Sequence, residues 1–212
     1  MRIFGPTLNL LNNLPLGTPA GLVLRHSIRF PILSDEEVYL AGLTPEGFEQ
    51  AEALGKELIQ RRPLGRLMAS PVVRCIDTAI SIAKGADWQV KLTTEFRLSH
   101  PHIESVWDGL PPHRSEKTMP APVRAVLDLV LNGQDERGGA LDVFVTHDTI
   151  VAVLAGFFLG HVFQYPDYWP DYLEGVLIWR NDTEIYLRWR NEEKVIGRWP
   201  LETSRQLRFG FF

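Results

Sequence analysis

The chain has 212 residues, of which 45% are apolar and 23% are charged, so it is long enough for one domain with a buried core. Its 22 basic and 26 acidic residues give a net charge of −4, whereas nucleic-acid-binding proteins usually carry a basic excess, so no nucleic-acid partner is expected. The single cysteine, Cys75, excludes an internal disulfide and with it the disulfide-rich scaffolds of small secreted proteins. We expect Cys75 to pack in the core.

Hydropathy gives no sign of a membrane segment. The most apolar run, residues 150–159, is ten residues long, and a helix needs about 20 such residues to span a bilayer. Near the amino terminus, Gly5 and Pro6 interrupt any apolar stretch of the kind that a secretory signal needs. We therefore expect a cytoplasmic protein without a membrane partner.

Short apolar runs alternate with helical patterns through the first three quarters of the chain. Thr44 and Pro45 supply an N-cap and a first-turn proline for one helix, and Ser70 and Pro71 do so for the next. Strands that alternate with helices favour a parallel sheet with right-handed crossovers. The pattern predicts strands at residues 21–24, 66–69, 89–93 and 141–146, and helices at 45–59, 72–83, 121–131 and 148–159.

The last quarter changes to an antiparallel pattern. Residues 175–179 and 184–189 flank a hairpin signal at Asn181 and Asp182, and residues 193–199 add a third strand. The chain, residues 1–212, is therefore predicted to be one domain of the α/β class. We expect a three-layer α/β/α sandwich with a mostly parallel central sheet and an antiparallel C-terminal hairpin at the edge.

Two irregular segments, residues 97–120 and 161–172, interrupt the alternating pattern. The second contains an aromatic cluster that is expected to pack the last helix against the hairpin, with stacking on a substrate ring as the alternative. The cluster consists of Phe163, Tyr165, Tyr168, Trp169 and Tyr172.

Arginine, histidine and other polar side chains follow three of the predicted parallel strands. Ligands of open α/β sheets bind at the carboxyl ends of the strands, where such side chains meet. Arginine presents a fork of donors that matches phosphate oxygens, and helix N-termini add backbone N–H groups. We therefore expect a phosphate-binding cleft in an otherwise acidic protein. The residues are Arg25, His26 and Arg29 after the first strand, Ser70 and Arg74 after the second, and His147 and Asp148 after the fourth.

These residues form three motifs in series. They are Arg25-His26-x-x-Arg29-x-Pro31, Ser70-x-x-x-Arg74-x-x-x-Thr78-Ala79 and Thr146-His147-Asp148-Thr149. In their order and their strand-then-helix context, they resemble the histidine phosphatase superfamily, which has a phosphoglycerate-mutase-like fold. The first motif and the histidine–aspartate pair are more similar to its acid-phosphatase branch than to its phosphoglycerate-mutase branch.

The resemblance implies a phosphatase that hydrolyses a small phosphorylated metabolite through a phosphohistidine intermediate, without a metal or other cofactor. It implies that His26 accepts the phosphoryl group and that Asp148 donates a proton to the leaving oxygen. It also implies that the phosphoryl group is held by Arg25, Arg29, Arg74 and His147. The nucleophilic imidazole has to be neutral, which neighbouring guanidinium charges favour, and its second ring nitrogen needs an acceptor such as a backbone carbonyl.

Two departures from the family pattern are present. Ser27 follows the nucleophile where family members usually have glycine, so its side chain either crowds the phosphate or offers it a hydroxyl. The chain is also short for the acid-phosphatase branch, whose larger members carry a helical cap domain. Residues 97–120 and 161–172 are therefore predicted to be small lids over a fairly open pocket.

Several alternatives remain open on the sequence. Glu95 is the alternative general acid, because the mutase branch takes its acid from the corresponding region. A metal-dependent phosphohydrolase would use His100 and His102 with His147 and Asp148 as ligands. Two further alternative functions are a non-catalytic phospho-ligand-binding protein of the same fold and a mutase.

Overall fold

The fold is built on one seven-stranded sheet, seen in a computed structural model that describes residues 3–99, 119–134, 138–161 and 169–200. The strands lie in the order β3-β2-β4-β1-β5-β6-β7. Neighbours from β3 to β1 are parallel, and those from β1 to β7 are antiparallel. The strands are β1 (Ala20–Arg25), β2 (Leu64–Ala69), β3 (Leu92–Thr94), β4 (Leu141–Thr146), β5 (Gly175–Arg180), β6 (Glu184–Trp189) and β7 (Glu192–Arg198). The predicted α/β class with an antiparallel C-terminal hairpin is confirmed.

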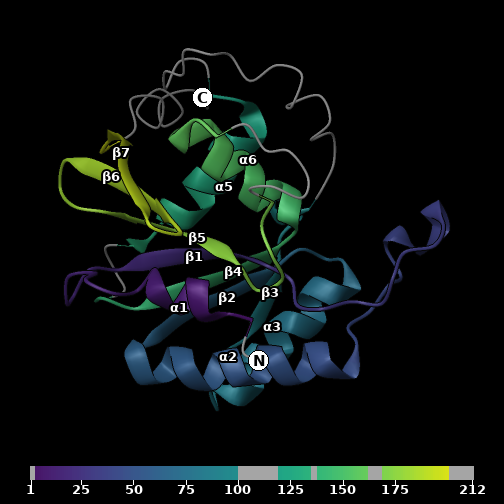
Figure 1. Cartoon of the computed structure of the whole chain (residues 1–212). Helices are drawn as coiled ribbons and strands as arrows, with labels where there is room; N and C mark the ends of the chain where they lie inside the picture. The colour runs from purple at the N-terminus through teal and green to yellow at the C-terminus, as the bar shows by residue number, and fades with distance from the viewer. Residues whose placement is uncertain (1–2, 100–118, 135–137, 162–168, 201–212) are drawn as a thin grey trace, which may run out of the picture.

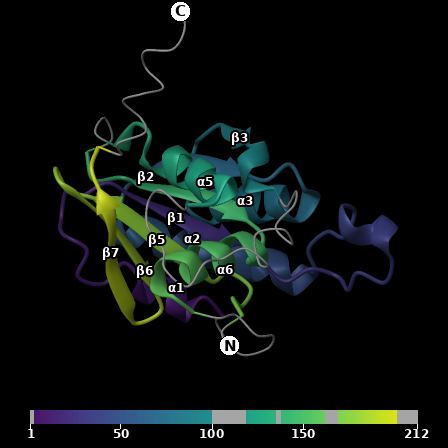
Figure 2. The same ribbon diagram turned by 90° about the horizontal axis from the view of Figure 1, so that it is seen from above.

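Helices cover both faces of this sheet, which gives the three predicted layers (Figure 1). Figure 2 shows the same layers from above. Each face has its own apolar core, one under α5 and α6 and the other under α1, α2 and α3. The helices are α1 (Gly5–Asn9), α2 (Pro45–Arg61), α3 (Val73–Gly85), α5 (Ala121–Leu131) and α6 (Asp148–Leu159), with short 3-10 turns η1 (Asp35–Val38) and η2 (Phe96–Leu98).

Of the two predicted N-caps, Thr44 of α2 is confirmed and Ser70 of α3 is not. Thr44 caps α2 as predicted, because its hydroxyl oxygen accepts from the backbone N–H of Gly47 at 3.0 Å. The predicted cap for α3 was wrong: this helix begins at Val73, and its N-cap, Val72, makes no side-chain cap bond. The Ser70 hydroxyl lies instead 3.0 Å from Nε2 of His147.

The α2 and α3 helices approach each other backbone to backbone. A Cβ atom added at Gly55 would lie 2.0 Å from the carbonyl oxygen of Ile82, and one at Gly85 would lie 1.9 Å from that of Glu52. Only glycine permits such a close approach. The contact fixes the position of α3 and therefore of Arg74 in its first turn.

The strand register brings the predicted site residues to one edge of the sheet. Arg25 pairs with Thr146, and Ala69 pairs with Val145. The backbone N–H of His26 donates to the carbonyl of Thr146, and that of Ser70 to the carbonyl of Val145, both at 2.9 Å. The residues that follow β1, β2 and β4 are therefore neighbours across the sheet.

Both predicted lids fall largely on residues 100–118 and 162–168, which lie outside the described part of the chain, so they stay predictions, as does the single-domain organisation. Among the described helices, none combines the length and apolar character that crossing a bilayer requires.

Candidate active site

The imidazole of His26 is held in one tautomer at the end of β1. Its Nδ1 lies 2.8 Å from the carbonyl oxygen of Ser27, which can only accept, so Nδ1 carries the proton. Its Nε2 lies 3.1 Å from Nε of Arg74, which can only donate, so Nε2 keeps its lone pair. The backbone acceptor expected from the sequence is therefore present, and Nε2 has the electronic state of a nucleophile.

Burial keeps this imidazole neutral. His26 is 2% exposed, and desolvation lowers its pKa well below the ordinary 6.5. The positive charges of Arg74 and Arg25 lower the pKa further, and the hydrogen bond to Ser27 opposes them. A ring that resists protonation keeps its nucleophilic nitrogen available in mildly acidic solution.

Arg74 joins the two histidines. Its Nε donates to His26, and its Nη2 lies 3.2 Å from Nδ1 of His147. Because a guanidinium only donates, Nδ1 of His147 accepts and the proton of this ring is on Nε2, which lies 3.0 Å from the Ser70 hydroxyl. The third nitrogen, Nη1, donates to the carbonyl of Val38 at 2.5 Å. Although burial lowers the pKa of Arg74, a guanidinium keeps its charge in proteins.

Arg25 and Asp148 form an ion pair beside these rings. Nη2 of Arg25 lies 3.1 Å from Oδ2 of Asp148, and its Nη1 donates to the carbonyl of Pro170 at 2.6 Å. The guanidinium carbon lies 4.1 Å from the centre of the Tyr172 ring, which is itself 5.8 Å from the His26 ring. Within the described residues, Nε of Arg25 is a buried donor without a hydrogen-bond partner, which suits an anion site.

Two predicted residues lie farther out. Arg29 is half-buried, and its Nη1 donates to the neighbouring carbonyl of Phe30 at 2.8 Å, although its charge is close enough to lower the pKa of Arg74. Glu95 is ion-paired with Arg97 at 2.6 Å, and this hydrogen-bonded partner lowers the pKa of the Glu95 carboxyl. In the described part of the chain, no hydrogen bond joins Glu95 to the histidines or to Arg74.

Ser27 neither crowds the cleft nor offers it a hydroxyl. Its side chain is fully buried, and Oγ donates to the carbonyl of Gly47 in α2 at 2.7 Å. Its backbone N–H donates to Oγ1 of Thr78, whose hydroxyl donates to the carbonyl of Arg74 at 2.7 Å. Ser27 therefore ties the end of β1 to α2 and α3.

Sequence reasoning missed the contribution of the aromatic cluster. Trp169 and Tyr172 were expected to pack against the hairpin, but the Trp169 indole N–H donates to Oδ2 of Asp148 at 3.2 Å, and Tyr172 lies against Arg25 and His26. No local pattern could have found this, because both residues precede β5 at a point that only the tertiary fold brings to the site. The other cluster members, Phe163, Tyr165 and Tyr168, lie outside the described residues.

The proposed metal ligands and the lone cysteine can be placed only in part. His100 and His102 lie outside the described residues, and among those described no group of three or more His, Cys, Asp or Glu could hold a metal ion. Cys75 is buried as expected, and its Sγ lies 3.4 Å from the carbonyl of Thr146. Burial raises the pKa of this thiol to about 12, so it is not a nucleophile near neutral pH.

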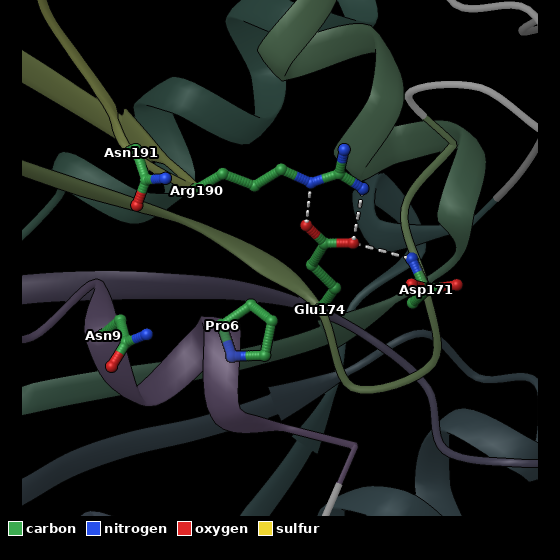
Figure 3. A pocket seen from close by; sticks show the side chains of 6 residues that line it. All are labelled: Pro6, Asn9, Asp171, Glu174, Arg190 and Asn191. Atoms are coloured by element: carbon green, nitrogen blue, oxygen red, sulfur yellow. Dashed lines mark hydrogen bonds and ion pairs between the residues drawn. The ribbon is translucent and has the colours of Figure 1, made fainter.

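A pocket of about 360 Å³ opens on the other side of residues 171–174 (Figure 3). Its walls come from α1, from the segment before β5 and from the turn between β6 and β7, and none of Arg25, Arg29 and Arg74 is among the described residues that line it. The lining residues are Pro6, Asn9, Asp171, Glu174, Arg190 and Asn191. The pocket is therefore separate from the histidine–arginine cluster.

Comparison with known proteins finds one family model that matches part of the chain and many solved structures that share its fold. The family model "Histidine phosphatase superfamily (branch 1)" matches residues 40–139, a range that contains Ser70 and Arg74 but neither His26 nor Asp148. No curated protein matches the chain.

Several solved structures have a similar fold. Phosphoglycerate mutase from Bacillus anthracis is 14% identical over 86% of this chain and 93% of its own, with a TM-score of 0.55. Mycobacterial glucosyl-3-phosphoglycerate phosphatase is 16% identical over 81% and 98%, with a TM-score of 0.56. The ecdysone phosphate phosphatase of Bombyx mori is 16% identical over 76% and 91%, with a TM-score of 0.51.

The branch differs from the one that the motifs predicted. The matching model is that of branch 1, and the comparisons give no support to the acid-phosphatase branch. Residues 40–139 are thus similar to branch 1 of the histidine phosphatase superfamily, and most of the chain shares the fold of the solved structures.

Proposed function

We propose that this chain is a metal-independent phosphomonoesterase that acts on a small phosphorylated metabolite through a phosphohistidine intermediate at His26. The observation that carries the proposal is the state of Nε2: it is unprotonated, and a guanidinium hydrogen-bonds it directly. A nucleophilic nitrogen and a phosphate-binding cation therefore meet at one point. The similar structures include phosphatases named for small phosphate esters, which supports this class of substrate.

The cations around His26 supply the binding energy for a phosphoryl group. Phosphoryl transfer depends mainly on positioning and on stabilising charge on the equatorial oxygens. Arg74 and Arg25 present guanidinium donors at close range, and Arg29 adds positive charge from the more exposed side. The N-terminus of α6, which follows His147, adds backbone N–H groups and its positive dipole end.

The first chemical step forms a bond between Nε2 of His26 and phosphorus while the ester P–O bond breaks. Arg74 has to turn its Nε away from Nε2 before the attack, and the phosphoryl oxygens are its new acceptors. Asp148 gives its proton to the leaving oxygen, so an alcohol departs and a carboxylate remains. In the second step this carboxylate takes a proton from water, whose oxygen attacks phosphorus and releases inorganic phosphate with the return of free His26.

Asp148 is a better choice of acid than Glu95. The carboxylate of Asp148 lies 3.1 Å from Arg25 in the cluster, whereas Glu95 is paired with Arg97 outside it, and this hydrogen-bonded partner lowers the pKa of Glu95. A bound phosphate dianion would compete with Asp148 for Arg25, and a proton on Asp148 relieves the repulsion between the two anions. This choice is the one implied by the resemblance to the acid-phosphatase branch, and Glu95 is the choice that the mutase branch would imply.

The test is turnover of p-nitrophenyl phosphate, with and without EDTA, by the wild type, by His26→Ala and by the matched variant His161→Ala. His161 lies after α6 and pairs with Glu192, away from the cluster. We expect chelator-resistant turnover in the wild type and in His161→Ala, and none in His26→Ala. A phosphoenzyme should be trapped only where His26 is present.

Three results would contradict the proposal. Substantial activity in His26→Ala would show that His26 is not the nucleophile. Loss of activity with EDTA would favour a metal-dependent phosphohydrolase. Saturable binding of phosphate without turnover would favour a non-catalytic phospho-ligand-binding protein.

A further inference from the structure

The carboxylate of Asp148 is held by more than its ion pair with Arg25. Its Oδ1 accepts from the backbone N–H of Thr149 at 2.9 Å, and its Oδ2 accepts from the indole N–H of Trp169 at 3.2 Å. The two oxygens are thus fixed from two directions, one by α6 and the other by the segment before β5. A single-point contact would leave the carboxyl group free to rotate.

We propose that Trp169 is a positioning residue for Asp148, which orients the carboxyl group for proton transfer to the leaving oxygen. The proposal rests on the phosphatase function proposed above. It separates the roles of the neighbouring groups: Arg25 and Arg74 determine how well phosphate binds, and Trp169 determines how well the proton is delivered.

A neutral donor suits this task better than a cation. When phosphate takes over Arg25, the carboxyl group loses an ionic partner, but the indole N–H can still hold Oδ2. Because the indole carries no charge, it orients the group without strongly favouring the carboxylate over the acid. Each carboxyl oxygen has a second lone pair, so the proton that is transferred can still be accommodated.

Trp169 is itself held by Arg190, which forms a half-buried ion pair with Glu174; Figure 3 shows this pair. Arg190 donates from Nη2 to the carbonyl of Trp169 at 3.2 Å, and it binds both carboxylate oxygens of Glu174, at 2.6 Å and 3.1 Å. Glu174 is 4% exposed and also accepts from the backbone N–H of Asp171 at 2.8 Å. The segment is therefore fastened at both ends, and a bidentate pair of this kind gives geometric precision.

The same segment also fastens the phosphate site. Pro170 accepts from Arg25 at 2.6 Å, and the backbone N–H of Leu173 donates to the carbonyl of His26 at 3.4 Å. A change at Trp169 has to leave these backbone contacts in place if it is to test positioning alone. Replacing the indole by phenylalanine removes the N–H and keeps an aromatic ring.

The experiment compares Trp169→Phe with the wild type on an alkyl phosphate and on p-nitrophenyl phosphate. We expect kcat for the alkyl ester to fall about 10-fold, as for loss of a hydrogen bond to a charged group, and kcat for the nitrophenyl ester to change far less, because its leaving group needs no proton. The inhibition constant for inorganic phosphate should not change. The control is Trp88→Phe, beyond the far end of α3, which should leave both reactions as they are.

An equal loss with both esters, or a weaker inhibition by phosphate, would mean that Trp169 has only a structural role and would overturn the proposal. If Trp169→Phe does not fold, Trp169→Leu, which also removes the donor, takes its place in the same comparison.

A second measurement does not depend on turnover. The indole N–H signal of Trp169, assigned by its loss in Trp169→Phe, should shift in Asp148→Asn, since its acceptor changes from a carboxylate to an amide. An unshifted signal would overturn the positioning role even if both esters are hydrolysed. Failure of the wild type to hydrolyse either ester would instead overturn the phosphatase function and leave the shift to decide whether the contact exists in solution.

Discussion

Nε of Arg74 donates to Nε2 of His26 at 3.1 Å, so the guanidinium lies at the nitrogen that attacks phosphorus in the proposed mechanism. The lone pair is therefore masked in the absence of an anion. Phosphate oxygens carry negative charge and match the guanidinium fork, so they are stronger acceptors for Arg74 than a neutral imidazole is. Binding of the phosphoryl group and release of the nucleophile are consequently coupled in one movement of Arg74.

The main effect of replacing Arg74 by alanine should be weaker binding of phosphate. Loss of a charged hydrogen-bond donor raises the inhibition constant for inorganic phosphate by about 10-fold or more. Arg61→Ala, which removes an exposed arginine from α2, is the matched control and should have no effect. An unchanged constant in Arg74→Ala would show that Arg74 does not hold the phosphate.

The lowered pKa of His26 predicts the behaviour of both activity and stability in acid. The folded-state pKa lies below the ordinary 6.5, so the unfolded chain binds more protons as the pH falls below that value. Stability contributed by the neutral, buried ring is therefore lost as the pH drops from 6.5 toward the folded-state pKa.

Urea denaturation over this range should show a smaller decline in His26→Gln than in the wild type. Any acidic limb of kcat/KM that belongs to His26 should have its midpoint below 6.5. An NMR titration in which His26 has the ordinary pKa of 6.5 would contradict both expectations.

The two candidate acids can be separated by leaving group. Asp148→Asn should slow hydrolysis of alkyl phosphates most, by a factor of about 100 or more, because removal of a general acid typically costs that much. Nitrophenyl phosphate should be affected far less. Glu95→Gln is the matched carboxylate-to-amide change, and we expect it to be nearly silent. If Glu95→Gln shows the leaving-group dependence instead, the acid of the mutase branch is the one in use.

Ser27→Ala tests whether the hydroxyl is structural. The change removes the hydrogen bond to Gly47 and should lower the free energy of unfolding by about 1 kcal/mol. The inhibition constant for phosphate should stay the same, because the buried hydroxyl does not face the cleft. A marked change in phosphate inhibition with unchanged thermal stability would show that the hydroxyl contacts the ligand.

Much of the site could be predicted because its residues are tied to regular elements. His26 and His147 each follow a strand directly, and Arg74 lies in the first turn of a helix, so the hydrophobic pattern alone gives their places. Parallel pairing of the strands then brings them together. The same logic predicted the order of strands and helices along the chain to within a few residues.

Other parts of the site depend on contacts that no local pattern reveals. Trp169 and Tyr172 are aromatic residues in an irregular segment, where the pattern favours packing in the core. Their position depends on the Arg190–Glu174 pair, whose members come from different elements. Ser70 was expected to cap α3, but the competing partner, His147, follows β4 and is 77 residues away in the sequence.

Three of the polar side chains at the centre of the site donate hydrogen bonds to peptide carbonyls. His26 donates to that of Ser27, Arg25 to that of Pro170 and Arg74 to that of Val38. A carbonyl oxygen is supplied by every amino acid, so exchange of the side chain at positions 27, 38 or 170 leaves the acceptor in place wherever the main chain keeps its course. The geometry of the cluster is in this respect independent of the side chains of these three partners. Drift at such positions is a route by which relatives with only 14–16% identity can keep one fold.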